Sequence, residues 1–469
     1  MTTGLVRNGL LFDAADGRWL GALDANGKEQ FLPAVPGISA GRPRIGVLGA
    51  SITNRNSYGG SGGNTVSSQI GFLQWAQAIL GIPFDVVSNA GIGGQTMSAV
   101  AARLQSDVLA YSPDVVILGG DGIGNSLNSG VSAATIYGQW ADCVEAILDA
   151  GKIPIVCTCP PNDKLSTAWD TTGAWTAEYH KINDMVKAAC RADSRLVLFP
   201  WDEIHADQTA ASSRPNTTSA TSQQTTAWTH DGTHPHPRMA IAMGTVLAGI
   251  LAGIFPARTL PFPNVNSHPY SALSNAVRNG SSGTLSGGAS GSASAGDTLN
   301  GNATVGAKVA RAGFSSNDEW QRVTTTNGTG SATYTFGMNA GIPGDKAAGV
   351  TPVFAAAEIM LLATPTNLRG FKLTLGFSGT GLFAAGFNTA ATGSSLNLAD
   401  AGPYIPQNKV LLLHTPIAAI PANATALTLA LEATKGGGGN LTADFYVGRA
   451  GVFAAPIVPF NNAGGIELP

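Results

Sequence analysis

Short apolar runs alternate with helix-length segments from residue 42 to about residue 257, and this alternation constrains the fold more than any other feature of the sequence. Strands are expected near 44–49, 84–89, 114–119, 153–158 and 195–199. Helices are expected near 67–80, 96–110, 131–150, 173–192 and 236–253. A strand–helix alternation of this kind is typical of a parallel sheet covered by helices on both faces. We therefore predict an α/β domain over 42–257, with a doubly wound, five-stranded parallel sheet of flavodoxin-like type.

The pattern changes on both sides of this domain, as expected for a chain of 469 residues, which is too long for one ordinary domain. Residues 1–41 have Asp-Gly and Asn-Gly turn signals between short apolar runs and predict a small β unit. Residues 258–298 are rich in Pro, Gly and Ser and predict a linker or a loosely ordered strand-loop region. Over 299–469, short β-type runs alternate with glycine-rich turns, which predicts an all-β, jelly-roll-like sandwich.

The charge and the cysteine spacing limit the kinds of partner and cofactor that are expected. The net charge of −3 gives no electrostatic reason to expect nucleic acid as a partner. Cys157 and Cys159 lie in one apolar strand-like run, without His or Cys neighbours at the spacing that metal ligands need. We interpret the cysteines as buried free thiols, and we expect no metal and no cofactor.

The sequence also gives expectations about location. The residues after Met1 contain no apolar segment, so no signal peptide is expected. The apolar run from Met239 to Ile254 is shorter than the about 20 residues that a membrane span needs, and it predicts a packed helix. We expect a protein that is cytoplasmic, or released or particle-associated, for example with a phage tail, where it could act outside the cell. The sequence leaves the oligomeric state open.

Three segments at the ends of expected strands or before the last helix carry groups suited to acyl transfer. Ser51 follows the first strand, where open α/β sheets place their ligand crevice. The glycines of 87–96 leave backbone N–H groups bare, as a developing oxyanion requires. Asp231 precedes His234 by three residues, so its carboxylate could orient an imidazole that takes a proton from serine. Each segment also has a plainer interpretation, as a turn or a helix cap.

In their order and spacing these segments resemble the SGNH hydrolases, also called the GDSL esterase/lipase family, over residues 42–257. The first block of that family, usually Gly-Asp-Ser, reads Gly49-Ala50-Ser51 here, and the second-block glycine corresponds to Gly94. The last block, Asp-x-x-His, corresponds to Asp231 and His234. The resemblance implies that Ser51 is the nucleophile, His234 the base and Asp231 its orienter. It also implies an oxyanion hole formed by the backbone N–H groups of Ser51 and Gly94.

The third block departs from the family pattern Gly-x-Asn-Asp, whose Asn donates to the oxyanion. It reads Gly119-Gly120-Asp121-Gly122-Ile123-Gly124-Asn125. Asn125 could be the third donor only if the loop bulges, and an ionised Asp121 cannot donate a hydrogen bond. Because a lost donor typically costs about 10²–10³ in rate, the sequence leaves a weakened or specialised enzyme open.

Other polar and aromatic residues near the last block are predicted to contact substrate. These are Trp228, His230 and His236. The polar segment 208–229 is predicted to be a long surface loop, and a role as a lid stays open. His180 and His205 are interpreted as ordinary surface or capping residues.

The implied function is a serine ester hydrolase that acts through an acyl-enzyme, on an acylated small molecule or a polysaccharide. The family includes carbohydrate deacetylases, lipases, acylhydrolases and thioesterases. The β region resembles carbohydrate-binding modules in general pattern, and the chain is rich in Ser, Thr and Asn. Both features favour an acetylated polysaccharide as substrate. The alternatives are a non-catalytic carbohydrate-binding or phage-tail-type adhesion protein on the same scaffold, and a short-chain lipase or acylhydrolase.

Overall fold

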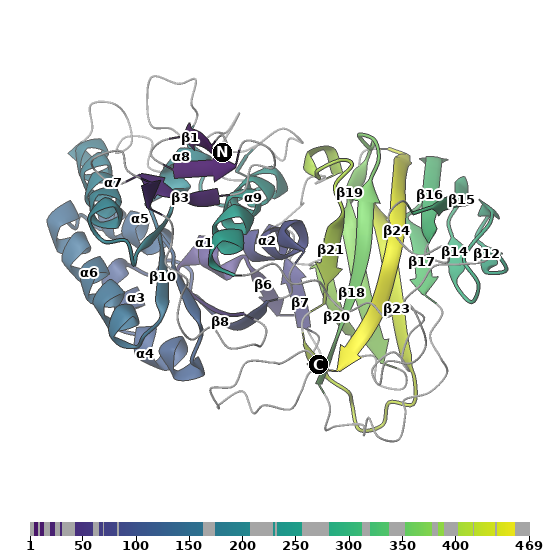
Figure 1. Ribbon diagram of the computed structural model, residues 1–469, viewed down its shortest axis with the longest axis horizontal. Coiled ribbons are helices and arrows are strands. Elements are labelled where there is room, and N and C mark those ends of the chain that lie inside the picture. The colour runs from purple at the N-terminus through teal and green to yellow at the C-terminus, as the bar shows by residue number, and fades with distance from the viewer. Residues whose placement is uncertain are drawn as a thin grey trace.

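A helical α/β half and a strand-rich half lie side by side in the computed structural model (Figure 1). The structure describes residues 4–7, 10–13, 19–23, 29–30, 43–59, 65–68, 70–81, 84–162, 174–206, 228–229, 232–255, 281–311, 319–336, 352–377, 383–388, 402–415, 417–436 and 439–454.

The centre of the α/β half is a five-stranded sheet whose strands all run parallel. Its strands are β5 (Arg44–Gly49), β8 (Asp85–Gly91), β9 (Val115–Leu118), β10 (Ile153–Cys157) and β11 (Val197–Phe199). They lie in the order β11-β10-β9-β5-β8, which is the flavodoxin-like order, so the predicted fold class is confirmed. The chain reverses its direction of winding between β5 and β9. In sheets of this kind, ligands bind at the carboxyl ends of the strands at that point.

Helices cover both faces of this sheet. One face carries α2 (Phe72–Leu80), α8 (Trp201–His205) and α9 (Pro237–Ile254). The other carries α3 (Met97–Ala101), α4 (Leu104–Asp107), α5 (Asp121–Asn128), α6 (Ala133–Asp149) and α7 (Ala174–Ala192). Side chains alternate between faces along a strand, so Val47 of β5 packs with the first set and Leu48 with the second. The one helix expected over 96–110 is divided into α3, α4 and a 3₁₀ turn at Leu109–Tyr111.

Helix α5 occupies the third block, where the sequence predicts a loop. Its glycines allow close packing. A Cβ at Gly120 would lie 1.9 Å from the Thr158 carbonyl oxygen, and one at Gly122 would lie 3.0 Å from Val100 Cγ2. Glycine here lets α5 approach the neighbouring strand end and α3, a need that the local sequence does not reveal.

The strand-rich half consists of two mixed sheets packed face to face. The eight-stranded sheet has the order β12-β14-β17-β23-β19-β20-β7-β6, and the seven-stranded sheet has the order β13-β15-β16-β24-β18-β21 with β22 beside β18. The rings of Phe371 and Phe445, one from each sheet, meet edge to face at 5.0 Å. Buried and more exposed residues alternate along β17 and β23, as in a sandwich with one face inward. The predicted β-sandwich is therefore confirmed, and it contains parallel pairs among its antiparallel ones.

The bounds of these strands are as follows. The first sheet contains β12 (Thr284–Ser286), β14 (Thr298–Asn300), β17 (Ala332–Phe336), β23 (Leu427–Lys435), β19 (Leu368–Phe377), β20 (Phe383–Asn388), β7 (Thr65–Ser68) and β6 (Ser57–Gly59). The second contains β13 (Ser290–Gly291), β15 (Thr304–Ala310), β16 (Glu319–Gly328), β24 (Leu441–Ala454), β18 (Pro352–Leu361), β21 (Leu411–His414) and β22 (Ala418–Ala419).

The two halves share strands and core. Strands β6 and β7 come from the α/β half of the sequence, yet β7 pairs with β20 of the sandwich. Helix α2 contacts β21, and α9 contacts the 3₁₀ turn η4 (Gly402–Tyr404). One buried apolar cluster runs from α2 and α9 into the sandwich. Figure 1 shows α2, β6 and β7 lying between the two halves.

The strand-rich structure begins earlier in the chain than the predicted boundary at residue 299. Strands β12 and β13 lie inside the range 258–298 that the sequence predicts as a linker, and residues 256–280 are outside the described part. As domain limits, 42–257 and 299–469 remain predictions. The sheet pairing shows that the strand-rich structure begins no later than Thr284 and also includes a hairpin from 57–68.

The first residues form a separate small sheet. Its antiparallel strands are β1 (Gly4–Arg7), β2 (Leu10–Asp13), β3 (Trp19–Leu23) and β4 (Glu29–Gln30). The turn signals at 16–17 and 26–27 lie outside the described residues. Strand β3 contacts α9. Helix α9 is long and apolar enough to cross a membrane by composition alone, but most of its residues are buried and it packs on α2.

Candidate active site

Ser51 lies at the carboxyl end of β5, beside the point where the sheet reverses its winding. It is the first residue of the short helix α1 (Ser51–Asn54), and it is half-buried. The N–H groups in the first turn of a helix have no intrahelical partner, so they are available to other acceptors. Gly49 allows this tight turn, because a Cβ there would lie 2.1 Å from Thr53 Oγ1. The strand therefore delivers a hydroxyl and backbone N–H donors to the same edge of the sheet.

The glycine turn after β8 lies against Ser51. The Ile92 N–H donates to the Gly49 carbonyl oxygen at 3.2 Å. A Cβ built on Gly93 would lie 3.9 Å from the Cβ of Ser51, so the two segments are neighbours. Gly94 is exposed and has a φ of +78°, a conformation that favours glycine. The structure thus brings the serine turn and the Gly94 turn together.

The Asp121 carboxylate lies against the backbone of the serine turn. Its side chain is buried, and its carboxylate accepts the N–H of Thr53 at 2.9 Å and that of Gly122 at 3.2 Å. Burial raises the pKa of this carboxyl group, while hydrogen bonds from the Thr53 and Ala50 N–H groups oppose the rise. Because both carboxylate oxygens accept backbone N–H groups, Asp121 anchors the serine turn. A place for Asp121 in the oxyanion hole stays a prediction.

Asn125 lies on α5, which continues as a helix without the bulge that the sequence argument required. Its Nδ2 donates to the Gln95 carbonyl oxygen at 2.9 Å. Asn125 therefore braces the turn that contains Gly94 from the α5 side. Its role as the third oxyanion donor stays a prediction.

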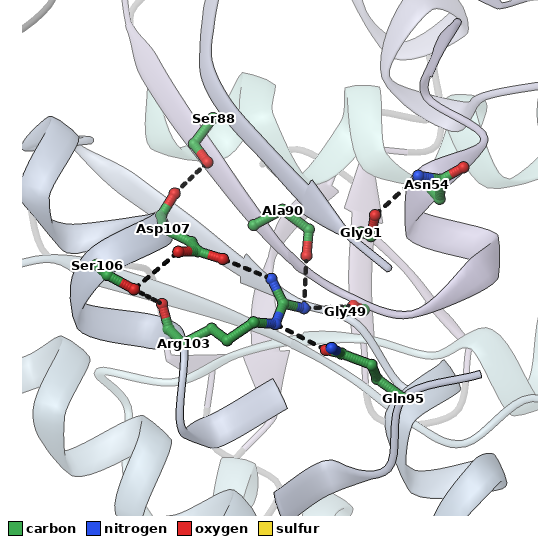
Figure 2. A network of polar contacts seen from close by, with 9 residues as sticks. All are labelled: Gly49, Asn54, Ser88, Ala90, Gly91, Gln95, Arg103, Ser106 and Asp107. Atoms are coloured by element: carbon green, nitrogen blue, oxygen red, sulfur yellow. Dashed lines mark hydrogen bonds and ion pairs between the residues drawn. The ribbon is translucent and has the colours of Figure 1, made fainter. Parts of the chain in front are cut away.

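Arg103, which the sequence analysis did not single out, joins these segments (Figure 2). Its guanidinium donates to the carbonyl oxygens of Gly49 at 3.2 Å and Ala90 at 3.0 Å. It also donates to Gln95 Oε1 at 2.7 Å and Asp107 Oδ2 at 2.8 Å. One side chain thus connects the end of β5, the end of β8 and the glycine turn. In the sequence, Arg103 and Asp107 look like an ordinary i,i+4 surface pair.

Asn54 adds a second connection between the same strands, visible at the right of Figure 2. Its Nδ2 donates to the Gly91 carbonyl oxygen at 2.8 Å. A Cβ on Gly91 would lie 2.2 Å from the backbone nitrogen of Asn54, so glycine is needed for this close approach of the two backbones. The two strand ends that carry Ser51 and the Gly94 turn are therefore fixed relative to each other on both sides.

His234 lies in a closed turn directly before α9. The turn is closed by a β-bridge between Thr229 and Pro235 and by a hydrogen bond from the His236 N–H to the Trp228 carbonyl oxygen at 2.9 Å. Thr233 Oγ1 donates to Asn162 Oδ1 at 2.6 Å, which ties the turn to the segment after β10. His234 is half-buried. The turn is therefore held at the carboxyl edge of the sheet, the edge that carries Ser51.

Several predicted residues near this turn lie outside the described part. These are Asp231, His230 and residues 208–227. Trp228 is half-buried, and the guanidinium carbon of Arg238 lies 4.3 Å from its ring centroid. His236 is only 2% exposed and caps α9, so its side chain is packed within the protein. The substrate-contact roles of Trp228, His230 and His236 stay predictions.

His205 corrects the expectation of an ordinary surface or capping histidine. It is fully buried in α8, with its Nε2 3.2 Å from Met243 Sδ and its ring stacked on Trp201. Burial lowers the pKa of His205 from 6.5 to about 3, so the imidazole is neutral at ordinary pH. An isolated histidine gives no local sequence signal of such burial.

The cysteines of the described residues are thiols in buried or half-buried positions. The four cysteines are free, and Cys143, Cys157 and Cys159 are buried, as predicted. Burial raises the pKa of the Cys143 thiol to about 12, so it is not a reactive thiolate. In the described part of the chain, no group of His, Cys, Asp or Glu is arranged to hold a metal ion.

Comparison with known proteins gives a family and several distant structural likenesses. The sequence model of the GDSL-like lipase/acylhydrolase family matches residues 47–240. A lipase/acylhydrolase from Enterococcus faecalis is 20% identical, with a TM-score of 0.33, over 46% of this chain and 100% of that chain. An acetyl xylan esterase is 16% identical, with a TM-score of 0.33, over 45% of this chain and 100% of that one.

A carbohydrate esterase family 3 protein from Talaromyces cellulolyticus is 14% identical, with a TM-score of 0.30, over 45% of this chain and 96% of that chain. At these low TM-scores the structural likenesses support no conclusion about substrate. No curated protein matches the sequence. The family match covers both the serine turn and the histidine turn. Over residues 47–240 the chain is therefore similar to the GDSL-like lipase/acylhydrolase family, and this match is consistent with a carboxylic ester hydrolase.

Proposed function

We propose that this protein hydrolyses esters through an acyl-enzyme formed on Ser51, with His234 as the base and Asp231 as the residue that orients it. The observation that carries the proposal is the position of Ser51. It begins α1 at the carboxyl end of β5 and faces the turn that contains Gly94. A nucleophile, two sources of backbone N–H donors and a histidine turn thus meet the same edge of one sheet.

The reach of His234 is consistent with this role. Neighbouring strands lie about 4.8 Å apart, so the carboxyl ends of β5 and β10, with β9 between them, lie about 10 Å apart. The hydrogen bond between Thr233 and Asn162 ties the histidine turn to the segment that follows β10. This attachment supports a position of the imidazole on the Ser51 side of the sheet.

The proposed reaction has two stages, formation of the acyl-enzyme and its hydrolysis. His234 takes the proton from Ser51 Oγ as that oxygen bonds to the ester carbonyl carbon. The backbone N–H groups of Ser51 and Gly94 stabilise the negative charge on the carbonyl oxygen. The bond to the alkoxy oxygen then breaks, and His234 gives the proton to the leaving alcohol. Water, deprotonated by His234, attacks the acyl-enzyme and releases the acid, which restores Ser51.

Within this reaction class, we propose an acetylated polysaccharide as the substrate. The low charge of the chain, 12% Asp, Glu, Lys and Arg, and its abundance of small polar residues suit a neutral sugar polymer. A β-sandwich attached to the catalytic half is an arrangement suited to holding a polymer. A short-chain lipase and a binding-only, particle-associated adhesion protein are the competing functions.

Hydrolysis of p-nitrophenyl acetate by the wild type, Ser51→Ala and His234→Ala tests the chemistry. We expect both variants to lose at least about 10³-fold in kcat. Ser98→Ala is the matched control, because this serine is exposed on α3 beyond the glycine turn. Equal rates for wild type and Ser51→Ala would remove the proposed nucleophile.

Two further measurements separate the substrates. We expect kcat/KM to fall from p-nitrophenyl acetate to the octanoate ester, and acetate to be released from acetylated xylan. A preference for octanoate would favour a lipase. Retention on acetylated xylan without any ester hydrolysis would favour the binding-only function.

A further inference from the structure

We propose that the strand-rich half positions the turn that carries His234, through a stack of Tyr404, Arg238 and Trp228. This inference rests on the proposed function for its catalytic meaning. It goes beyond that function by making part of the sandwich a component of the active site's framework. The residues of the stack are positioning residues, because they act on His234 through the backbone of its turn.

The stack crosses the boundary between the two halves. The guanidinium carbon of Arg238, on α9, lies 4.3 Å from the ring centroid of Trp228 and 5.1 Å from that of Tyr404. Trp228 precedes the histidine turn, and Tyr404 belongs to η4 of the strand-rich half. A guanidinium that lies over an aromatic face is attracted to the ring, and Arg238 has two such rings within reach. Arg238 therefore links η4 to the start of the turn.

The position of Arg238 in its helix supports this role. It is the second residue of α9, after Pro237, where the positive end of the helix dipole disfavours a cation. The residue is thus poorly placed for the stability of α9 itself. The two aromatic rings beside its guanidinium give its charge a favourable environment.

The sandwich end of the stack is firmly held. A Cβ on Gly402 would lie 2.6 Å from the Leu368 carbonyl oxygen, so the backbone of η4 presses directly on the start of β19. Ile405, next to Tyr404, is 2% exposed and belongs to the core cluster. Tyr404 therefore projects from a fixed part of the sandwich towards α9.

The other end of the stack, at the histidine turn, is held by backbone contacts. The Trp228 carbonyl oxygen accepts the His236 N–H at 2.9 Å, and Thr229 bridges to Pro235. These contacts close the turn around His234. Displacement of Trp228 would therefore shift the backbone of the turn that carries His234.

The serine side of the site has a similar connection. Only four residues lie between the last residue of α1, Asn54, and the last residue of β6, Gly59. The following strand, β7, pairs with β20 through Thr65–Ala384 and Val66–Ala385. The sandwich thus pairs with the hairpin that follows α1 and contacts α9, the helix that follows the histidine turn (Figure 1). Attachments to both of these segments favour a positioning role over simple tethering.

The test compares Tyr404→Leu with Tyr404→Phe. Leu keeps apolar volume but removes the aromatic face, whereas Phe keeps the face. We expect Tyr404→Leu to lower kcat for p-nitrophenyl acetate about three- to thirtyfold with little change in KM, and Tyr404→Phe to remain near wild type. Tyr446→Leu is the matched control, because Tyr446 is a half-buried sandwich tyrosine stacked on Trp320.

A second variant guards against loss of folding. If Tyr404→Leu is insoluble, Arg238→Lys keeps the charge and removes the planar group, and the same loss of kcat is expected. Wild-type kcat in Arg238→Lys or in soluble Tyr404→Leu would overturn the proposal. So would a loss confined to KM, or an equal loss of kcat in the Tyr446→Leu control.

Hydrogen–deuterium exchange provides a readout that is independent of activity. We expect faster exchange in a peptide over 228–240 in Tyr404→Leu than in wild type or Tyr446→Leu, because the His236 N–H loses its fixed acceptor. Unchanged exchange there would overturn the positioning role even in an active enzyme. Faster exchange in a protein without esterase activity would instead support the stack and count against the proposed function.

Discussion

Arg103 donates hydrogen bonds to both strand ends of the proposed oxyanion site, at the carbonyl oxygens of Gly49 and Ala90. We predict that Arg103→Lys lowers kcat by about tenfold or more, with a smaller effect on KM, because a lysine ammonium cannot span the acceptors that the planar guanidinium reaches. Steady-state kinetics with p-nitrophenyl acetate would measure the change. Arg195→Lys, in an exposed ion pair with Asp193, is the control. Wild-type kcat in Arg103→Lys would show that the network does not set the geometry of the site.

Because His205 is buried with a lowered pKa, we predict that the free energy of unfolding depends on pH. Its pKa in the folded protein is about 3, below the value of 6.5 for a free histidine, so between these values the unfolded chain binds the proton more strongly. Stability contributed by the neutral imidazole is present above pH 6.5 and is lost as the pH falls towards 3. Acidification from pH 6.5 to 4 should cost about 3 kcal/mol at this site.

The comparison that isolates this effect is urea unfolding of wild type and His205→Phe across pH 4 to 7. Phe cannot be protonated and can keep the stacking on Trp201. We expect the stability of the variant to change less with pH in this range. Parallel pH profiles for the two proteins would mean that other groups cause the acid sensitivity.

Among single site residues, the sequence predicts those that belong to a local motif. Ser51 and Gly94 lie on neighbouring segments because strand ends and glycine turns can be recognised locally. Asp121 and Arg103 could not be assigned, because their partners Thr53 and Gly49 are 68 and 54 positions away in the chain. Only the sheet order brings such residues together.

Helix α5 illustrates how glycine acts at the scale of an element. We predict that Gly120→Ala destabilises the protein by more than about 2 kcal/mol, because the new Cβ would meet the Thr158 carbonyl oxygen at 1.9 Å. Gly138→Ala is the control within α6, where a Cβ meets nothing within 4 Å. That change should stabilise by about 1 kcal/mol. Thermal unfolding would measure both, and equal effects would contradict the packing argument.

Elements with a clear period were predicted from the sequence, and elements that depend on distant contacts were not. The five parallel strands and the helices α6, α7 and α9 follow from apolar runs and helix-length periodicity. Helix α5 was interpreted as a turn because its glycines resemble loop residues. Strand β7 lies where a helix was expected to begin, because its pairing partner β20 is more than 300 residues further along the chain.

The shared core predicts that the α/β half depends on the sandwich for its stability. Removal of residues 281–469 would expose the apolar faces of α2 and α9 and leave β7 without its partner. We expect this truncated chain to be insoluble, or to unfold at a markedly lower temperature than the full chain. Differential scanning calorimetry and gel filtration would measure the difference. A soluble truncated protein with an unchanged Tm and wild-type kcat would show that the halves are independent.

The hairpin β6–β7 has a consequence for how such a chain could change in evolution or engineering. Appended modules are commonly exchanged by cutting in a linker and joining another module at the same place. Here the chain crosses into the partner sheet within a few residues of Ser51 and returns to form α2. A replacement module would have to offer a matching edge strand to β7. Graft donors should therefore be chosen by the edge they present, since a junction near residue 280 alone would leave the hairpin unpaired.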